Sequence, residues 1–375
     1  MAVINGTSGD DILNGGAAAD QIFGFAGNDI LNGNGGNDQL DGGTGSDTMT
    51  GGTGNDIYFV DDVGDSVIES AGQGTDEVRT TLATYALGAN VERLRFTGSG
   101  SFTGTGNALN NELHGGASGD TLSGGDGYDY LVGNGGTDSL YGGADGDTLD
   151  GGSGADYLEG NDGNDVYLVD NVGDTVVEAA NEGIDEIFTS LSSYTLGANF
   201  EDLYFNAGSG NFTGTGNAAD NDIHGGSGAD TLTGLDGNDE LDGGTNNDTL
   251  SGGDGDDRLY GNSGTDDLTG GNGDDTFAIS GFQTGLGASA DRILDFVQGE
   301  DIIDVSGMDA NLLSGGNQAF SFIGTGAFSG ASAELRYFFD GTDTWIQGDI
   351  NGDGAADFEI FVSNAVTLTA TDFVL

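Results

Sequence analysis

The chain has 375 residues, of which 64 are acidic and 6 are basic, and its formal net charge is -58. This charge excludes nucleic acid and anionic lipid as partners held by bulk electrostatics, and it indicates a cation instead. The absence of cysteine excludes disulfides and thiolate metal sites. By composition alone, the 76 glycines and the like charge are typical of a disordered chain.

No signal for membrane insertion or N-terminal export is visible. A run of about 18 apolar residues, which a membrane-spanning helix needs, does not occur. The first residues, from Met1 to Gly6, lack the basic and apolar regions of a secretory signal peptide. If the protein is exported, we therefore expect the signal to lie elsewhere in the chain.

A nonapeptide recurs in three blocks and argues against disorder. Each unit has glycine first, aspartate sixth and a large apolar residue eighth, a phase that random Gly/Asp-rich sequence would not keep. Asn111 and Asn221 occupy the aspartate position one period before the second and third blocks, and we interpret them as degenerate repeats. The sixth-position aspartates are Asp11, Asp20, Asp29, Asp38, Asp47, Asp56, Asp120, Asp129, Asp138, Asp147, Asp156, Asp165, Asp230, Asp239, Asp248, Asp257, Asp266 and Asp275.

Each unit is predicted to form a tight turn followed by a short strand. Glycines allow close backbone approach in the turn, so that carbonyl groups can point at a shared centre. Alternation in the strand sends the eighth residue to one face, where stacked copies form a narrow core. Carboxylate and carbonyl oxygens, without histidine or cysteine in the pattern, favour calcium over magnesium, zinc or copper.

The pattern resembles the repeat of the RTX (repeats-in-toxin) family, whose consensus is G-G-x-G-x-D-x-U-x. Gly15 to Phe23 and Gly51 to Phe59 show the match. The resemblance implies an all-β fold, a parallel β-roll in which multiple Ca²⁺ ions lie between same-side turns, held by all eighteen aspartates and by turn carbonyls. Some units replace a consensus glycine, a change that keeps a carbonyl ligand but is expected to strain the turn. The replaced glycines are the fourth-position ones at Ala18 and Asn246 and the second-position ones at Phe25, Asn34, Asn134, Asn161, Leu235 and Asn262.

Sites at the ends of the blocks lack a neighbour on one side and should be weaker or empty. These are the sites around Asp11, Asp120, Asp230 and Asp275.

The regions between the blocks are copies of each other, because Tyr85-Ala86-Leu87-Gly88 in the first matches Tyr194-Thr195-Leu196-Gly197 in the second. We expect these β segments to cap the rolls, and a surface for a glycan or another partner is the alternative. The predicted domains are roll block 1, spacer, roll block 2, duplicated spacer, roll block 3 and a C-terminal β domain, at residues 1–60, 61–103, 104–169, 170–213, 214–280 and 281–375.

The C-terminal region resembles the domain that follows the β-roll in serralysin-type metalloproteases. The terminal Asp372-Phe373-Val374-Leu375 is similar to that family's uncleaved type I secretion signal, which implies the type I secretion apparatus as a partner. Asp349-x-Asn351-x-Asp353-Gly354 also resembles the start of an EF-hand loop, but Ile360 stands where that loop needs glutamate. A metal site and a simple strand turn both remain open there.

No catalytic residue is predicted. The chain has no H-E-x-x-H motif, no G-x-S-x-G motif and only two histidines, His114 and His224, which are duplicates with an expected structural or surface role. The preferred hypothesis is a secreted, non-enzymatic protein of the extracellular space or cell surface, with a surface-layer, filament, matrix or adhesion role and self-association or a cell-surface glycan as partners. The alternative is a secreted glycan-processing or other hydrolytic enzyme with a cryptic site.

Overall fold

The structure is a computed structural model that describes residues 1–280, 285–311 and 316–375. The expected C-terminal domain, 281–375, thus includes two short segments, 281–284 and 312–315, that lie outside the described residues. The described chain divides into two compact units, Met1–Asp185 and Glu186–Leu375. Among the described residues, none forms a helix long and apolar enough to cross a membrane.

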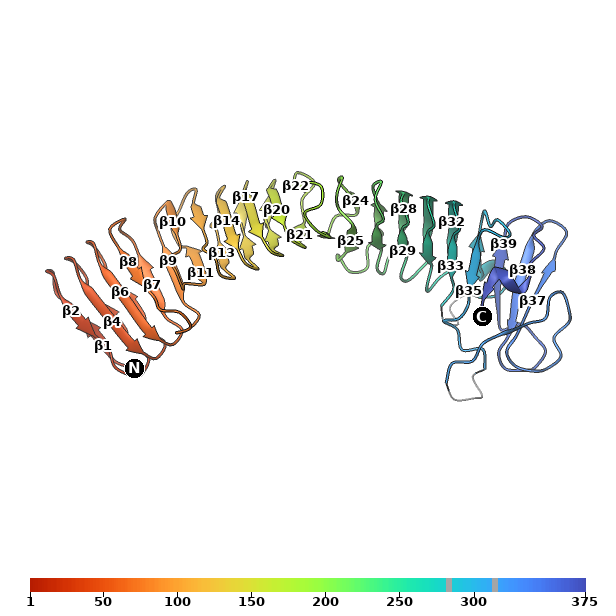
Figure 1. Cartoon of the computed structure of the whole chain (residues 1–375), viewed down its shortest axis with the longest axis horizontal. Coiled ribbons are helices and arrows are strands. Elements are labelled where there is room, and N and C mark those ends of the chain that lie inside the picture. The colour runs from red at the N-terminus through yellow and green to blue at the C-terminus, as the bar shows by residue number, and fades with distance from the viewer. Residues whose placement is uncertain (281–284, 312–315) are drawn as a thin grey trace. The chain divides into compact units, whose positions relative to one another are not determined.

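The first unit stacks short parallel strands on two faces (Figure 1). One face is a continuous ladder of β1 (Val3–Asn5), β3 (Gln21–Phe23), β5 (Gln39–Asp41), β7 (Ile57–Val60), β9 (Glu77–Thr80), β11 (Arg93–Phe96), β13 (Glu112–His114), β15 (Tyr130–Val132), β18 (Thr148–Asp150) and β21 (Val166–Val169). The other holds β2 (Ile12–Asn14), β4 (Ile30–Gly35), β6 (Thr48–Thr53) and β8 (Ser66–Ile68), then separately β10 (Thr84–Ala86), β12 (Thr103–Thr105), β14 (Thr121–Asp126), β17 (Ser139–Ala144), β20 (Tyr157–Asp162) and β22 (Thr175–Val177). A short pair, β16 (Gly135–Gly136) and β19 (Ser153–Gly154), runs along the turns.

The register of this stack follows from the nonapeptide. Each repeat contributes one turn and one strand, so successive strands fall on alternate faces and same-face neighbours are two repeats apart. Leu31 accordingly pairs with Met49, and Ile22 with Leu40. The predicted parallel β-roll is confirmed.

Eighth-position residues form the core of both units. Every one of them is fully buried except Leu13, which lies near the end of the stack. Burying a Leu, Ile or Phe side chain contributes about 1.5–3 kcal/mol, and stacking repeats is the only way for such short strands to obtain it.

The spacers add further turns to the same ladder with a changed register. Tyr58 of β7 pairs with Val78 of β9, an offset of 20 residues, and Val78 pairs with Leu94, an offset of 16. The longer turn lets residues 69–76 leave the nine-residue pattern before the ladder resumes.

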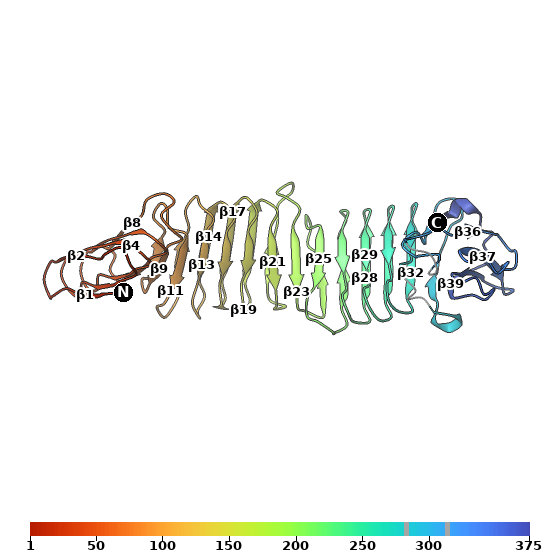
Figure 2. The ribbon, with the colours of Figure 1, turned by 90° about the horizontal axis from the view of Figure 1, so that it is seen from below.

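The second unit has the same two-faced architecture. One face comprises β23 (Glu186–Thr189), β25 (Asp202–Phe205), β27 (Asp222–His224), β29 (Glu240–Asp242), β31 (Arg258–Tyr260), β33 (Thr276–Ala278), β35 (Ile302–Asp304) and β40 (Phe373–Val374). The other comprises β24 (Ser193–Thr195), β26 (Thr213–Thr215), β28 (Thr231–Asp236), β30 (Thr249–Asp254), β32 (Asp267–Asn272), β34 (Asp291–Ile293), β39 (Phe358–Val362), β38 (Thr344–Asp349), β37 (Glu334–Phe339) and β36 (Ser321–Phe322). Figure 2 shows these strands following one another within the unit.

The C-terminal region ends the parallel stack with antiparallel strands. β38 pairs antiparallel with both β37 and β39, and two 3₁₀ turns, η1 (Gly287–Ser289) and η2 (Ala370–Asp372), complete the region. The terminal strand β40 pairs with β35 through Phe373 and Ile303. The residues that resemble a secretion signal are therefore part of the fold.

Candidate metal centres

The repeat aspartates lie where each turn enters its strand, and the fold removes them from solvent. Every sixth-position aspartate is buried except Asp11, which is partly exposed. Asp138 in the middle of the second block, for example, is 1% exposed. A row of buried carboxylates is unfavourable unless each charge is paired or coordinates a metal.

One oxygen of each carboxylate belongs to a backbone ladder along the stack. Oδ1 of Asp138 accepts the backbone N–H of Asp120 at 2.6 Å, and Oδ1 of Asp156 accepts that of Asp138 at 2.8 Å. The same bond, always 18 residues apart, recurs in the third block, where Asp239 donates to Asp257. The ladder orients every carboxylate alike.

The second oxygen is left without a protein partner. Oδ2 is buried and accepts no hydrogen bond in fourteen repeats, which is far from the usual satisfaction of buried polar atoms and leaves each atom its desolvation cost. These repeats are those of Asp29, Asp38, Asp47, Asp56, Asp129, Asp138, Asp147, Asp156, Asp165, Asp230, Asp239, Asp248, Asp257 and Asp266.

The free oxygen borders a space above the first glycine of its repeat. A Cβ placed on Gly142 would lie 2.2 Å from Oδ2 of Asp147 and 2.8 Å from the carbonyl oxygen of Gly160, two repeats later. A cation in this space would therefore meet a carboxylate and a carbonyl from same-side turns. Oxygen ligands of these two kinds are those that calcium takes in proteins, so the residues fit the ion.

Burial also shifts the proton affinity of these groups. Desolvation raises the pKa of Asp147 and of Asp248 to about 8, and that of Asp129 and Asp266 to about 7. Near the start of the chain the effect is opposite, because backbone N–H groups of Ala2 and Gly16 lower the pKa of Asp20. These four interior carboxylates are thus held in an environment that disfavours their charge.

The ends of the blocks differ from the interior, but not uniformly. Asp11 accepts bonds from the backbone N–H and hydroxyl of Thr7, and Oδ2 of Asp120 accepts the N–H of Gly116 at 2.5 Å. Asp230, in contrast, keeps an unpartnered Oδ2. Inside the first block, Oδ2 of Asp20 also accepts a backbone N–H, from Gly16 at 2.9 Å. The weaker binding expected at the four end sites stays a prediction.

In the degenerate repeats, the asparagine amide forms hydrogen bonds to the backbone and needs no cation. Oδ1 of Asn221 accepts the N–H of Asn217 at 2.8 Å, and Nδ2 donates to the carbonyl oxygens of Phe200 and Glu201 at 2.9 and 3.1 Å. Asn111 makes the equivalent bonds. An amide supplies its own donor, so neutral turns introduce the second and third blocks.

The nonapeptide grid missed several aspartates that continue the ladder. Asp65 and Asp174 accept the N–H groups of Asp47 and Asp156, each at 3.0 Å, and both lie nine residues after a block's last aspartate, a signal present in the sequence. The others are displaced by longer turns, which hides them from a fixed period: Asp76, Asp185, Asp291 and Asp301.

The remaining candidates from the sequence have local roles. Both oxygens of Asp349 accept backbone N–H bonds, from Gly352 and Gly354, in the loop that joins β38 to β39, an arrangement that fits a strand turn. His114 and His224 each contact the acidic residue two positions earlier, Glu112 at 2.8 Å and Asp222 at 2.9 Å.

Two family models match the chain. The RTX calcium-binding nonapeptide repeat matches at residues 5–40, 23–58, 32–67, 105–140, 132–167 and 141–176, which lie in the first two blocks and their flanks. The C-terminal domain of the M10 serralysin peptidases matches at residues 209–375, which hold the third block and the region after it.

Comparison with individual proteins adds two solved structures. The R3 subunit of the mannuronan C5-epimerase AlgE6 from Azotobacter vinelandii is 28% identical, with 45% of this chain and 80% of that one covered and a TM-score of 0.28. The extracellular lipase LipA from Serratia marcescens is 12% identical, with 88% and 67% covered and a TM-score of 0.23. No curated protein matches the chain.

The buried aspartate ladder, the parallel roll and the two family matches all indicate the same kind of protein. The repeat match covers the first two blocks, and the serralysin match covers the third block with the strands that end the stack. The chain is therefore an RTX protein, a calcium-binding β-roll followed by a C-terminal domain of the serralysin type.

Proposed function

We propose that this secreted calcium-binding protein folds on extracellular calcium and serves a structural role at or near the cell surface, with the eighteen sixth-position aspartates as ligands. The observation that carries the proposal is the row of buried Oδ2 atoms without protein partners. Those of Asp29, Asp38, Asp138, Asp147 and Asp239 lie beside a turn carbonyl of the same-side neighbour, so one cation can satisfy both.

The charge of the chain makes folding depend on the metal. At -58, self-repulsion opposes compaction, and the fold adds the cost of burying its carboxylates. If roughly one divalent ion binds per repeat aspartate, about +36 is added, which offsets more than half of the repulsion. Binding and folding are then one coupled process.

The affinity range of such sites suits export. Extracellular calcium modules bind at about 10⁻⁴ to 10⁻³ M, well above cytosolic calcium. The chain would stay unfolded inside the cell, pass through the type I secretion apparatus by means of its C-terminal residues, and fold outside.

The regular outer surface of the roll supports the structural role. Long parallel ladders hold the core inside and present alternate side chains outward at a regular spacing, and solenoid surfaces of this kind suit repeated contacts. We infer a surface-layer, filament, matrix or adhesion component that binds copies of itself or a cell-surface glycan.

The experiment uses the full chain after removal of metal with EDTA. Far-ultraviolet circular dichroism should show a largely disordered chain that gains β-structure cooperatively with millimolar calcium, and much less with equal magnesium. Sedimentation and electron microscopy in calcium should then show ordered assemblies or binding to the cell surface. A fully folded metal-free chain contradicts the folding proposal, and a protein that stays monomeric and unbound in calcium contradicts the structural role.

A further inference from the structure

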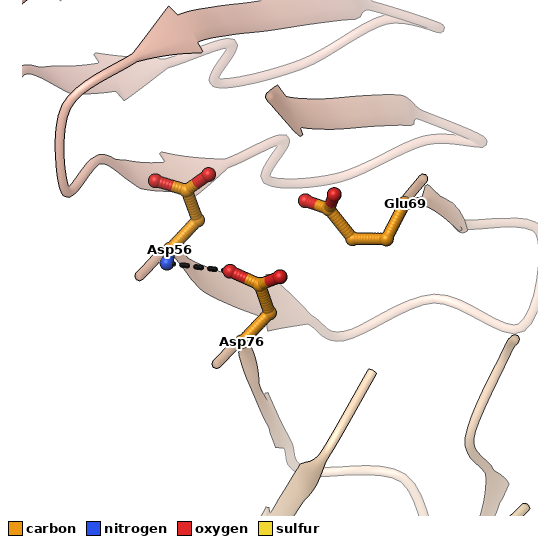
Figure 3. Close-up of side chains that lie close together, drawn as sticks. All are labelled: Asp56, Glu69 and Asp76. Carbon is orange, nitrogen blue, oxygen red and sulfur yellow. Dashed lines mark hydrogen bonds between the residues drawn. The ribbon is translucent and has the colours of Figure 1, made fainter. Parts of the chain in front are cut away.

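Three carboxylates gather where the first roll block meets its spacer (Figure 3). Asp56 precedes β7, Glu69 follows β8 and Asp76 precedes β9. One oxygen from each lies within 4.8 Å of the others. Figure 3 shows Glu69 directed toward the two aspartates, while Asp76 accepts the backbone N–H of Asp56 at 2.8 Å. Glu69 and Asp76 lie off the nine-residue grid.

The cluster occurs twice with identical spacing. Asp165, Glu178 and Asp185 form the second copy, again with 13 and 7 residues between successive members and with one oxygen each within 4.8 Å. Asp165 precedes β21 and Glu178 follows β22, as their counterparts do in the first copy. The duplication has therefore preserved a three-dimensional arrangement as well as a sequence.

An unpartnered oxygen points into each cluster. Asp56 is 1% exposed and Asp165 is 0% exposed, and Oδ2 of each is buried without a hydrogen-bond partner. Their Oδ1 atoms accept backbone N–H groups of Asp38 and Asp147, at 2.7 and 2.6 Å, which fixes the direction of Oδ2.

A tyrosine makes these sites different from the other roll sites. A Cβ on Gly51 would lie 2.1 Å from Oδ2 of Asp56 and 2.3 Å from the hydroxyl oxygen of Tyr58; on Gly160 the distances to Asp165 and Tyr167 would be 2.0 and 2.3 Å. At Gly133, Gly142 and Gly234 of the interior repeats a turn carbonyl, rather than a hydroxyl, lies near this point.

The same hydroxyl holds the glutamate in place. The Tyr58 hydroxyl accepts the N–H of Gly51 at 2.7 Å and donates to Oε1 of Glu69, and Tyr167 bonds Gly160 and Glu178 in the same way. The third block ends in Phe277 instead of tyrosine, and no such cluster forms there among the described residues. Tyrosine and glutamate thus occur together.

We propose that each cluster binds one calcium ion through three carboxylates, with the tyrosine hydroxyl positioning the glutamate, and that the ion ties the spacer loop to the last turn of the block. A third carboxylate raises the ligand charge, which is the feature that tightens calcium sites, so these two sites bind more tightly than the roll sites. The proposal rests on the calcium binding proposed above and adds Glu69, Asp76, Glu178 and Asp185 to the ligands.

The chemistry of each cluster favours a hard divalent cation. Three carboxylates within 4.8 Å, two of them on aspartates that are 1% exposed in the first copy, repel one another strongly in a medium of low dielectric. The second copy has a further carboxylate beside it, because Glu182 interacts with Glu178 at the position where the first copy has Gln73. We therefore expect the second site to bind calcium more tightly than the first.

The test is a calcium titration of the full chain by isothermal calorimetry, comparing wild type with the double variant Glu69→Gln/Glu178→Gln. Glutamine can still accept the tyrosine bond but lacks the charge. We expect the tightest class of sites to lose two equivalents per chain, or to weaken about tenfold or more, while the remaining equivalents bind as before. If the number and affinity of the tightest sites are unchanged in the variant, the proposal is overturned. The same holds if the only effect of the variant is a more stable calcium-free chain, with calcium binding unchanged.

A second double variant keeps the proposal testable if the first does not fold. Tyr58→Phe/Tyr167→Phe keeps every carboxylate and the core ring, and the loss of positioning should weaken the two tight sites without changing their number. If the glutamine variant does not fold in calcium, this pair decides, and wild-type affinity in it overturns the proposal.

Two further variants serve as controls. Asp62→Asn is the matched control, because the second spacer already carries Asn171 there with the same bond to its turn, and it should titrate like wild type. Asp138→Ala separates this proposal from the general one, because it should weaken binding at the roll sites beside it and leave the two tight sites in place.

Discussion

Each repeat aspartate divides its two oxygens between two tasks. In the block interiors, Oδ1 accepts the backbone N–H of the residue 18 positions earlier, and Oδ2 is buried without a protein partner above the first glycine of its repeat. Asparagine at the same position, as in Asn111 and Asn221, keeps a similar turn, but the oxygen and nitrogen of its amide both form hydrogen bonds to the backbone. The negative charge, rather than the turn, therefore distinguishes a cation site from a neutral repeat.

This division predicts unequal effects of two similar substitutions. Asp138→Ala removes a buried ladder bond and an interior ligand, so we expect it to raise the calcium midpoint of folding and to destabilise the folded chain by about 1–3 kcal/mol. Asp11→Ala, at a partly exposed carboxylate already bonded to Thr7, should do much less. Circular dichroism during calcium titration measures both, and equal shifts would argue against sites shared between neighbouring turns.

At the scale of the element, the turn is shaped by the backbone freedom of a few positions. The second position of the repeat is left-handed, with φ of +77° at Phe25 and +93° at Leu235. A bulky residue is strained in this region, whereas glycine or asparagine at the same position of other repeats is not. The first glycine has no positive φ at Gly142, so glycine there leaves open the space in which we propose a cation.

The turn therefore predicts that a single methyl group can block a site. In Gly142→Ala the new Cβ would lie 2.2 Å from Oδ2 of Asp147, so we expect weaker calcium binding and a loss of about 1–3 kcal/mol from overpacking. Gly9→Ala is the control, because nothing lies within 4 Å of its Cβ. Calorimetric titration and thermal melting in calcium compare the two, and a Gly142→Ala chain that binds like the Gly9→Ala chain would show that this space holds no ion.

At the scale of the whole molecule, protons and calcium compete to neutralise the buried aspartate carboxylates. Burial raises the pKa of Asp147 and Asp248 to about 8, against about 4 for an ordinary aspartate. A carboxyl whose pKa is higher in the folded chain binds its proton more tightly there, so protonation favours folding. That contribution is complete below about pH 4 and is lost as the pH rises through the folded values of about 6 to 8.

We therefore expect opposite pH dependences with and without calcium. In EDTA, the chain should gain β-structure as the pH falls from about 8.5 to about 5, because protons remove the buried charge. With calcium, the midpoint of folding should move to higher calcium over the same range, because protons compete for the ligands. Circular dichroism at a series of pH values measures both, and a metal-free chain whose β-structure is lost on mild acidification would contradict the burial of ionised aspartates.

The sequence by itself determined the period, the roll and the identity of the metal. Every repeat has the same local chemistry, so contacts between residues 18 apart, such as Leu31 with Met49, follow from one turn and one strand per nine residues. The hard oxygen ligands likewise indicate calcium without any coordinates. Local rules were sufficient where the chain repeats itself.

Only the tertiary structure decided which oxygen is free and what lies beside it. The spacers pair with offsets of 20 and 16 residues, so no fixed period could place Glu69 and Asp76 beside Asp56, or show that Tyr58 reaches the glutamate. Likewise, only the structure places both carboxylate oxygens of Asp349 in hydrogen bonds to backbone N–H groups of the turn between β38 and β39. Where turn lengths vary, the position of a side chain depends on how the whole loop packs, and this information is not local in the sequence.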